Sequence, residues 1–118
     1  MNILIVDDSE HFRALISDLT DKMGFKSYTA DNGYEALPLI VEAEVDLLIT
    51  DIEMPVMDGY RLTQIAREKG VQIIVMTGNN TLVDKTKAEV FGSEVCCIKD
   101  ETLSSSLEEI LIKIGNEK

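Results

Sequence analysis

The chain has 118 residues, 45% of them hydrophobic, and a formal net charge of −11. Its length fits one domain, so we expect a single domain over residues 1–118. The acidic balance argues against direct binding of nucleic acid, whose phosphates attract Lys and Arg. No apolar run approaches the roughly 20 residues that a membrane span needs. No charged leader precedes the first apolar run, which predicts a cytoplasmic protein.

Four short apolar runs predict buried strands. They occupy residues 3–6, 47–50, 71–76 and 95–98, and each is nearly continuous rather than alternating. Continuous apolar runs are typical of strands in a sheet that is covered on both faces. Residues 25–29 alternate polar and apolar side chains instead, so we expect an edge strand there.

Apolar side chains at helical spacing between these runs predict five helices. In chain order the stripes are Phe12-Leu15-Ile16-Leu19-Met23, Ala36-Leu37-Ile40-Val41, Leu62-Ile65-Ala66, a weak one within residues 80–91, and Leu103-Leu107-Ile110-Leu111-Ile114. The expected N-caps are Asn32, Asp58 and either Asp100 or Thr102. Pro38 falls inside the second helix, which is therefore expected to start late or to bend.

The resulting order is a strand followed by a helix, repeated five times. Because crossovers between parallel strands are right-handed, this order predicts an α/β, flavodoxin-like (βα)5 fold. Its five-stranded parallel sheet would have the order 2-1-3-4-5, with helices on both faces.

Polar residues suited to phosphate chemistry stand where the strands end. Asp7 and Asp8 follow the first strand, Asp51 follows the third, Thr77 the fourth and Lys99 the fifth. The carboxyl ends of parallel strands meet at one edge of a sheet, so these side chains should form one pocket. Three clustered carboxylates repel one another, and oxygen ligands of this kind suit Mg²⁺.

Asp51 is the best candidate nucleophile, because a carboxylate can accept a phosphoryl group as an acyl phosphate. Lys99 and a cation would offset charge on the transferring oxygens, and Thr77 could donate a hydrogen bond to them. A simpler interpretation stays open, in which Asp8 only caps the first helix and Asp51 only ends a strand. We expect His11 to be a surface residue rather than a catalytic one.

The chain resembles, over its whole length, the receiver domain of bacterial two-component response regulators, as in the chemotaxis regulators. The motifs that carry the resemblance are Ile-Val-Asp7-Asp8, Asp51-Ile-Glu-Met-Pro-Val-Met-Asp58-Gly59, Met76-Thr77-Gly78 and Ile98-Lys99. The second string is the most specific of them. The resemblance implies that Asp51 is the phosphoacceptor, that Thr77 is a switch hydroxyl and that Lys99 contacts the phosphoryl group.

The resemblance also implies a magnesium site and a set of partners. Asp8 and Asp51 would bind Mg²⁺ directly with the backbone carbonyl of Glu53, and Asp7 would act mainly through a metal-bound water. The donor would be a phosphohistidine on a sensor histidine kinase or a phosphotransfer protein, and a downstream protein target would read the switch. No enzymatic activity is expected beyond slow self-dephosphorylation.

Three residues depart from the family's usual pattern, and one of them is Pro38, which interrupts the second helix. Asp100 stands where a proline usually follows the lysine, and Cys96 stands where an aromatic residue is usual. An alternative hypothesis is therefore a degenerate receiver that binds partners without phosphorylation. A hydrolase that acts through an aspartyl phosphate is a third, weaker hypothesis, because Glu53 is the only nearby candidate for its second acid.

Overall fold

A computed structural model of the chain describes residues 1–52, 59–78 and 95–116. The side chains at 59–60 and 95–96 are not described. The predicted helix within residues 80–91, the predicted cap Asp58 and the candidate ligand Glu53 lie outside these residues.

The five described strands form one parallel sheet in the order β2-β1-β3-β4-β5, so the predicted topology is confirmed. The strands are β1 (Asn2–Val6), β2 (Lys26–Ala30), β3 (Leu47–Asp51), β4 (Gln72–Thr77) and β5 (Val95–Ile98). The strand β2 is an edge strand with partly exposed side chains, as its alternating pattern predicts.

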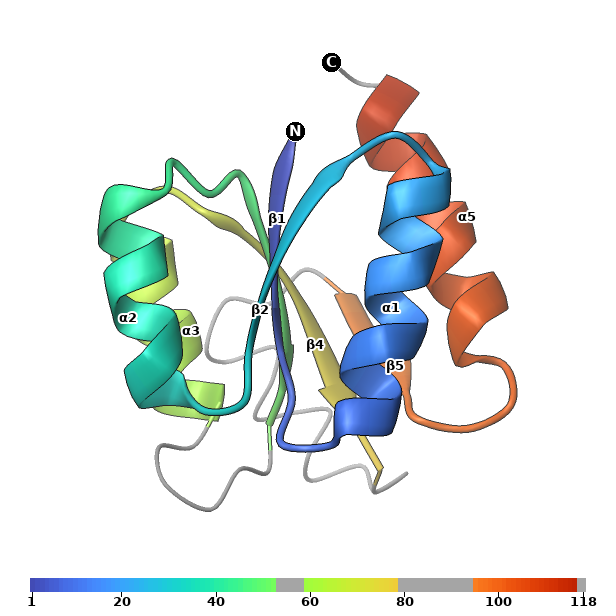
Figure 1. Cartoon of the computed structure of the whole chain (residues 1–118), viewed down its shortest axis with the longest axis horizontal. Coiled ribbons are helices and arrows are strands. Elements are labelled where there is room, and N and C mark those ends of the chain that lie inside the picture. The colour runs from blue at the N-terminus through green and yellow to red at the C-terminus, as the bar shows by residue number, and fades with distance from the viewer. Residues whose placement is uncertain (53–58, 79–94, 117–118) are drawn as a thin grey trace.

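Helices cover both faces of this sheet in the part of the chain that the structure describes (Figure 1). The helices are α1 (Glu10–Lys22), α2 (Gly33–Glu42), α3 (Gly59–Glu68) and α5 (Leu103–Asn116). Helices α1 and α5 lie on one face, and α2 and α3 lie on the other. Among the described helices, none has the length and apolar character needed to cross a membrane.

The sheet separates two apolar cores, and β1 contributes to both. Leu4 and Val6 belong to the core under α2 and α3, whereas Ile3 and Ile5 belong to the core under α1 and α5. Successive strand side chains point to opposite faces, so a strand between two cores must be apolar at every position. This requirement explains the continuous apolar runs in the sequence.

The helix α2 differs from its prediction in two respects. It begins directly after Asn32, whose side chain accepts a hydrogen bond from the Glu35 amide, and it continues past Pro38 to Glu42. A late start at Pro38 is therefore wrong. The assignment of Val41 to the buried stripe is also wrong, because 62% of Val41 is exposed.

The two sides of α5 allow a test of this packing. Leu107 is fully buried in the core, whereas Ile112 on the same helix is 50% exposed. We expect Leu107→Ala to lower the free energy of unfolding by about 2–5 kcal/mol, because it removes buried methyl groups and leaves a cavity. The control Ile112→Ala should change it by less than about 0.5 kcal/mol. Urea denaturation measures both, and equal losses would contradict the placement of α5.

Candidate functional site

The carboxyl ends of four neighbouring strands bring the candidate residues to one edge of the sheet. Asp7 follows β1, Asp51 ends β3, Thr77 ends β4 and Lys99 follows β5. One carboxylate oxygen from each of Asp7, Asp8 and Asp51 lies within 4.8 Å of the others. The convergence that the sequence predicts is therefore present in the fold.

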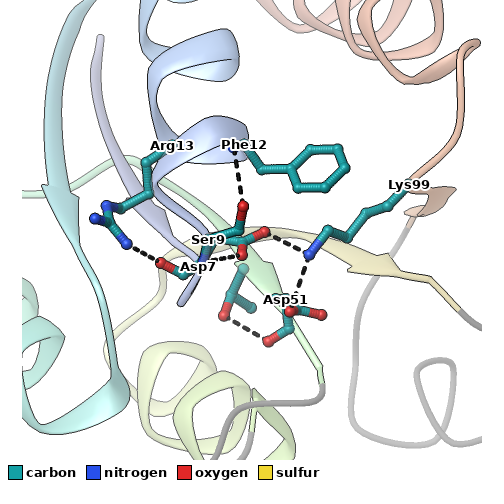
Figure 2. Close-up of polar contacts among 7 residues, drawn as sticks. Asp7, Ser9, Phe12, Arg13, Asp51 and Lys99 are labelled. Carbon is teal, nitrogen blue, oxygen red and sulfur yellow. Dashed lines mark hydrogen bonds and ion pairs between the residues drawn. The ribbon is translucent and has the colours of Figure 1, made fainter.

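Lys99 joins two of these carboxylates. Its Nζ atom lies 2.8 Å from Asp7 Oδ2 and 3.1 Å from Asp51 Oδ2 (Figure 2). The Lys99 side chain is only 11% exposed, and the two acidic side chains are at least as deeply buried. Charged groups removed from water in this way require close partners of opposite sign.

The environment of Lys99 acts on its pKa in two opposite ways. Burial lowers the pKa of the ammonium, because it disfavours the charged form. The contact with Asp7 and the charges of Asp51 and Asp7 raise it, and together they outweigh burial. The pKa of Lys99 therefore lies above its ordinary value, and the group is a cation throughout the physiological pH range.

The start of α1 holds Asp7 in place. The Ser9 amide donates to Asp7 Oδ1 at 2.8 Å, and Arg13 Nη1 donates to the Asp7 carbonyl oxygen at 2.7 Å (Figure 2). The N-cap of α1 is Ser9, whose hydroxyl accepts from the Phe12 amide, so the interpretation of Asp8 as this cap is wrong. Neither Ser9 nor Arg13 was among the predicted site residues, although Ser directly before a helical stripe is a recognised cap signal.

The acidic cluster fits a hard cation. Within the described segments, three carboxylates and one ammonium form the cluster, so negative charge is in excess among them. Asp7 Oδ2 is buried and, despite its ion pair with Lys99, has no partner with hydrogen-bond geometry in the described part of the chain. Asp8 is exposed, so the cluster is open to solvent on one side. An oxygen-only donor set with this excess charge suits Mg²⁺.

The turn after β5 sets the backbone of Lys99. Its amide donates to the carbonyl oxygen of Thr77 at 2.9 Å. Asp100 Oδ1 accepts hydrogen bonds from the Thr102 hydroxyl and, at 2.8 Å, from the Thr102 amide. The hydroxyl and then the amide lower the pKa of Asp100, and Thr102 directly precedes α5. No peptide bond in the described segments is cis, so Lys99 reaches both carboxylates through a trans connection to Asp100.

The remaining candidates are placed as follows. Thr77 is fully buried at the end of β4, beside the strand that ends in Asp51. His11 is exposed, as expected, and its ring meets the Phe12 ring edge-on. Glu53 lies outside the described residues. Cys96 is in β5, but its side chain is not described.

Comparison with known families agrees with this geometry. Residues 3–111 match the family model described as "Response regulator receiver domain". The chain belongs to the response regulator receiver family. The flavodoxin-like sheet and the acidic edge of this receiver are thus those that the sequence motifs predict.

Individual relatives include parts of larger proteins. The receiver is 36% identical over 105 residues to the sensor histidine kinase RcsC of Escherichia coli, covering 87% of this chain but 11% of the kinase. It is 32% identical to the probable transcriptional regulator ycf27 of Cyanidium caldarium, covering 96% of this chain and 47% of the regulator. The chain therefore spans a small part of the first relative and about half of the second.

Solved structures show the same fold. The Vibrio cholerae chemotaxis protein CheY4 is 27% identical and superposes with a TM-score of 0.86, covering 95% of this receiver and 96% of CheY4. The Thermotoga maritima response regulator TrrA, solved in complex with Mg²⁺-BeF, is also 27% identical, with a TM-score of 0.80. That pair covers 94% of this receiver and 96% of TrrA.

The raised pKa of Lys99 makes the stability of the receiver sensitive to alkaline pH. In buffer without divalent cations, Lys99→Met should lower the free energy of unfolding at pH 7 by roughly 3 kcal/mol, because buried carboxylates lose their partner. The contribution of Lys99 is fully present below the pKa of an unfolded lysine, about 10.4, and is lost as the pH rises through the higher folded value.

Urea denaturation of wild type and Lys99→Met from pH 7 to pH 12 measures this difference. It should stay constant up to about pH 10 and shrink above it. A difference that already shrinks between pH 7 and 9 would contradict a raised pKa.

Proposed function

We propose that this receiver accepts a phosphoryl group on Asp51 from a phosphohistidine donor, in a Mg²⁺-dependent reaction, and thereby switches a protein-interaction surface. The observation that carries the proposal is the contact of Lys99 Nζ with both Asp7 and Asp51, at the sheet edge where three carboxylates converge. A positive group fixed beside a nucleophilic carboxylate is suited to phosphoryl transfer.

Asp51 is the acceptor in this proposal. It ends the central strand β3, its Oδ2 contacts Lys99, and only 4% of the residue is exposed. A carboxylate oxygen of Asp51 attacks phosphorus, the bond from phosphorus to the donor's imidazole nitrogen breaks, and its electron pair stays with the ring. Lys99 remains beside the transferring oxygens and stabilises their charge.

The proposed direct magnesium ligands are Asp8, Asp51 and the backbone carbonyl of Glu53, and Asp7 would act mainly through a metal-bound water. The fit rests on the oxygen-only donor set, its excess negative charge and the buried Asp7 Oδ2. The chemistry that Mg²⁺ supplies when bound is neutralisation of charge on the phosphoryl oxygens. A Mg²⁺-BeF complex of the similar regulator TrrA supports this assignment.

The proposed partners follow from the acceptor chemistry and the relatives. A sensor histidine kinase or a phosphotransfer protein would supply the phosphoryl group, in line with the matching segment of RcsC. A downstream protein target would read the change, in which Thr77 acts as the switch hydroxyl. We place the protein in the cytoplasm as one receiver domain over residues 1–118, with slow self-dephosphorylation as its only turnover.

The phosphorylation-independent interaction module is the less favoured function. A receiver that had lost phosphotransfer would be under no constraint to keep its charged cluster. Here Asp7, Asp51 and Lys99 form a closely paired group despite Asp100 and Cys96 in place of the usual residues. This arrangement favours a competent phosphoacceptor.

The acceptor assignment has a direct test. Incubation with acetyl phosphate and Mg²⁺, followed by intact-mass spectrometry, should show one added phosphoryl group on wild type and none on Asp51→Asn, because an amide cannot form the acyl phosphate. The control Asp18→Asn changes an exposed carboxylate on α1 and should be phosphorylated like wild type. An unchanged adduct on Asp51→Asn would rule out Asp51.

The metal assignment predicts stabilisation by Mg²⁺ before any phosphorylation. Binding to the folded state alone adds about 2.7 kcal/mol at a hundredfold excess over the dissociation constant. We therefore expect the melting temperature to rise in millimolar MgCl2, relative to KCl of equal ionic strength. Asp8→Asn should reduce the rise without disturbing the core, because Asp8 is exposed, whereas Asp18→Asn should keep it. Equal melting temperatures in the two salts would contradict a competent site.

A further inference from the structure

The ring of Phe12 lies against the central cation of the site. The Nζ atom of Lys99 is 4.4 Å from the centroid of the Phe12 ring, on its face (Figure 2). A cation within about 6 Å of a ring face is attracted by the negative charge density there. Phe12 thus contacts Lys99 from α1, while Asp7 and Asp51 contact it from the sheet edge.

The position of the Phe12 ring is itself fixed by its surroundings. Phe12 is the third residue of α1, and its amide donates to the capping hydroxyl of Ser9 at 3.4 Å. The ring packs partly buried against the core under α1 and α5, and the ring of His11 meets it edge-on at 5.3 Å between centroids. The start of α1 therefore fixes the positions of both the Asp7 carboxylate and the Phe12 ring.

The ammonium of Lys99 needs contacts that hold it in position more than the end of a stiffer side chain would. Its ammonium stands at the end of a flexible four-carbon stem, and holding that stem in one conformation costs entropy. Asp100 follows Lys99, so no proline ring restricts the backbone there; instead, the Lys99 amide donates a hydrogen bond to the Thr77 carbonyl oxygen. Contacts from α1 and from the sheet edge restrain the ammonium from two directions.

We propose that Phe12 is a positioning residue of this site, whose aromatic face holds the Lys99 ammonium where it meets both Asp7 and Asp51. The role of Phe12 in holding the Lys99 ammonium is inferred from these contacts alone. The effect of this positioning on phosphoryl transfer rests on the function proposed above. A merely structural Phe12 would fill space in the core, and any apolar side chain of similar size would replace it.

NMR of the full chain tests the positioning directly. The Lys99 ε-methylene protons should be shifted upfield by the ring and should have restricted motion on the picosecond-to-nanosecond timescale. Phe12→Tyr keeps the aromatic face and should preserve both signatures, whereas Phe12→Leu keeps apolar contact and should lose both. Phe25→Leu is the matched control, because Phe25 is also partly buried against the same core. It should leave Lys99 unchanged.

The rate of phosphorylation by acetyl phosphate tests the consequence. Phe12→Leu should slow it by about threefold to tenfold, in proportion to the strength of a partly buried cation–π contact. Phe12→Tyr and Phe25→Leu should stay within about twofold of wild type, and melting curves confirm that each variant is folded.

Two results would overturn the proposal: Lys99 equally ordered in Phe12→Leu and wild type, or equal phosphorylation rates in Phe12→Leu and Phe12→Tyr. A wild-type chain that accepts no phosphoryl group would instead overturn the proposed function. The NMR comparison would still decide whether Phe12 positions Lys99.

Discussion

The site depends on one electrostatic constraint, namely that, among the residues that the structure describes, three carboxylates share the edge of the sheet with a single ammonium. Two like charges about 4 Å apart repel by roughly 4 kcal/mol at the effective dielectric constant of a protein surface. The Lys99 contacts relieve part of this repulsion. The remaining excess charge favours a divalent cation, so the same crowding that destabilises the folded chain creates affinity for a metal.

The fold imposes this crowding through its topology. In a parallel sheet every strand ends at the same edge, so residues far apart in sequence, such as Asp7 and Asp51, become neighbours. The sheet must be apolar on both faces, because β1 contributes Leu4 and Val6 to one core and Ile3 and Ile5 to the other. Reactive side chains are therefore confined to the strand ends, where the core stops and solvent begins.

Lys99 keeps its contacts with the acidic cluster although Asp100, which follows it, is an unusual residue at that position in the family. The Asp100 carboxylate accepts from the Thr102 amide and leads the chain into α5. The Lys99 amide is tied to Thr77, and its side chain is held by carboxylates and by Phe12. Tertiary contacts thus supply a restraint that a proline would supply locally, and the family's acidic site persists without it.

The sequence by itself determined the strand order and the residues at the sheet edge. Continuous apolar runs follow directly from a sheet buried on both faces, and Asp7, Asp51 and Lys99 follow from their positions after those runs. The interior of α2 was predicted less well. Val41 has the spacing of a buried residue, but periodicity cannot state how far around the helix the core extends, and the structure leaves Val41 mostly exposed.

Tertiary structure alone decided how the site is held. Asp8 and Ser9 are both suitable caps by residue type, and the path of the chain out of β1 selected Ser9. Phe12 has the pattern of a core residue, and only the approach of α1 to the end of β5 places its ring over Lys99. Local sequence records propensity and polarity, whereas a contact between residues 12 and 99 exists only once α1 has packed on the sheet to which β5 belongs.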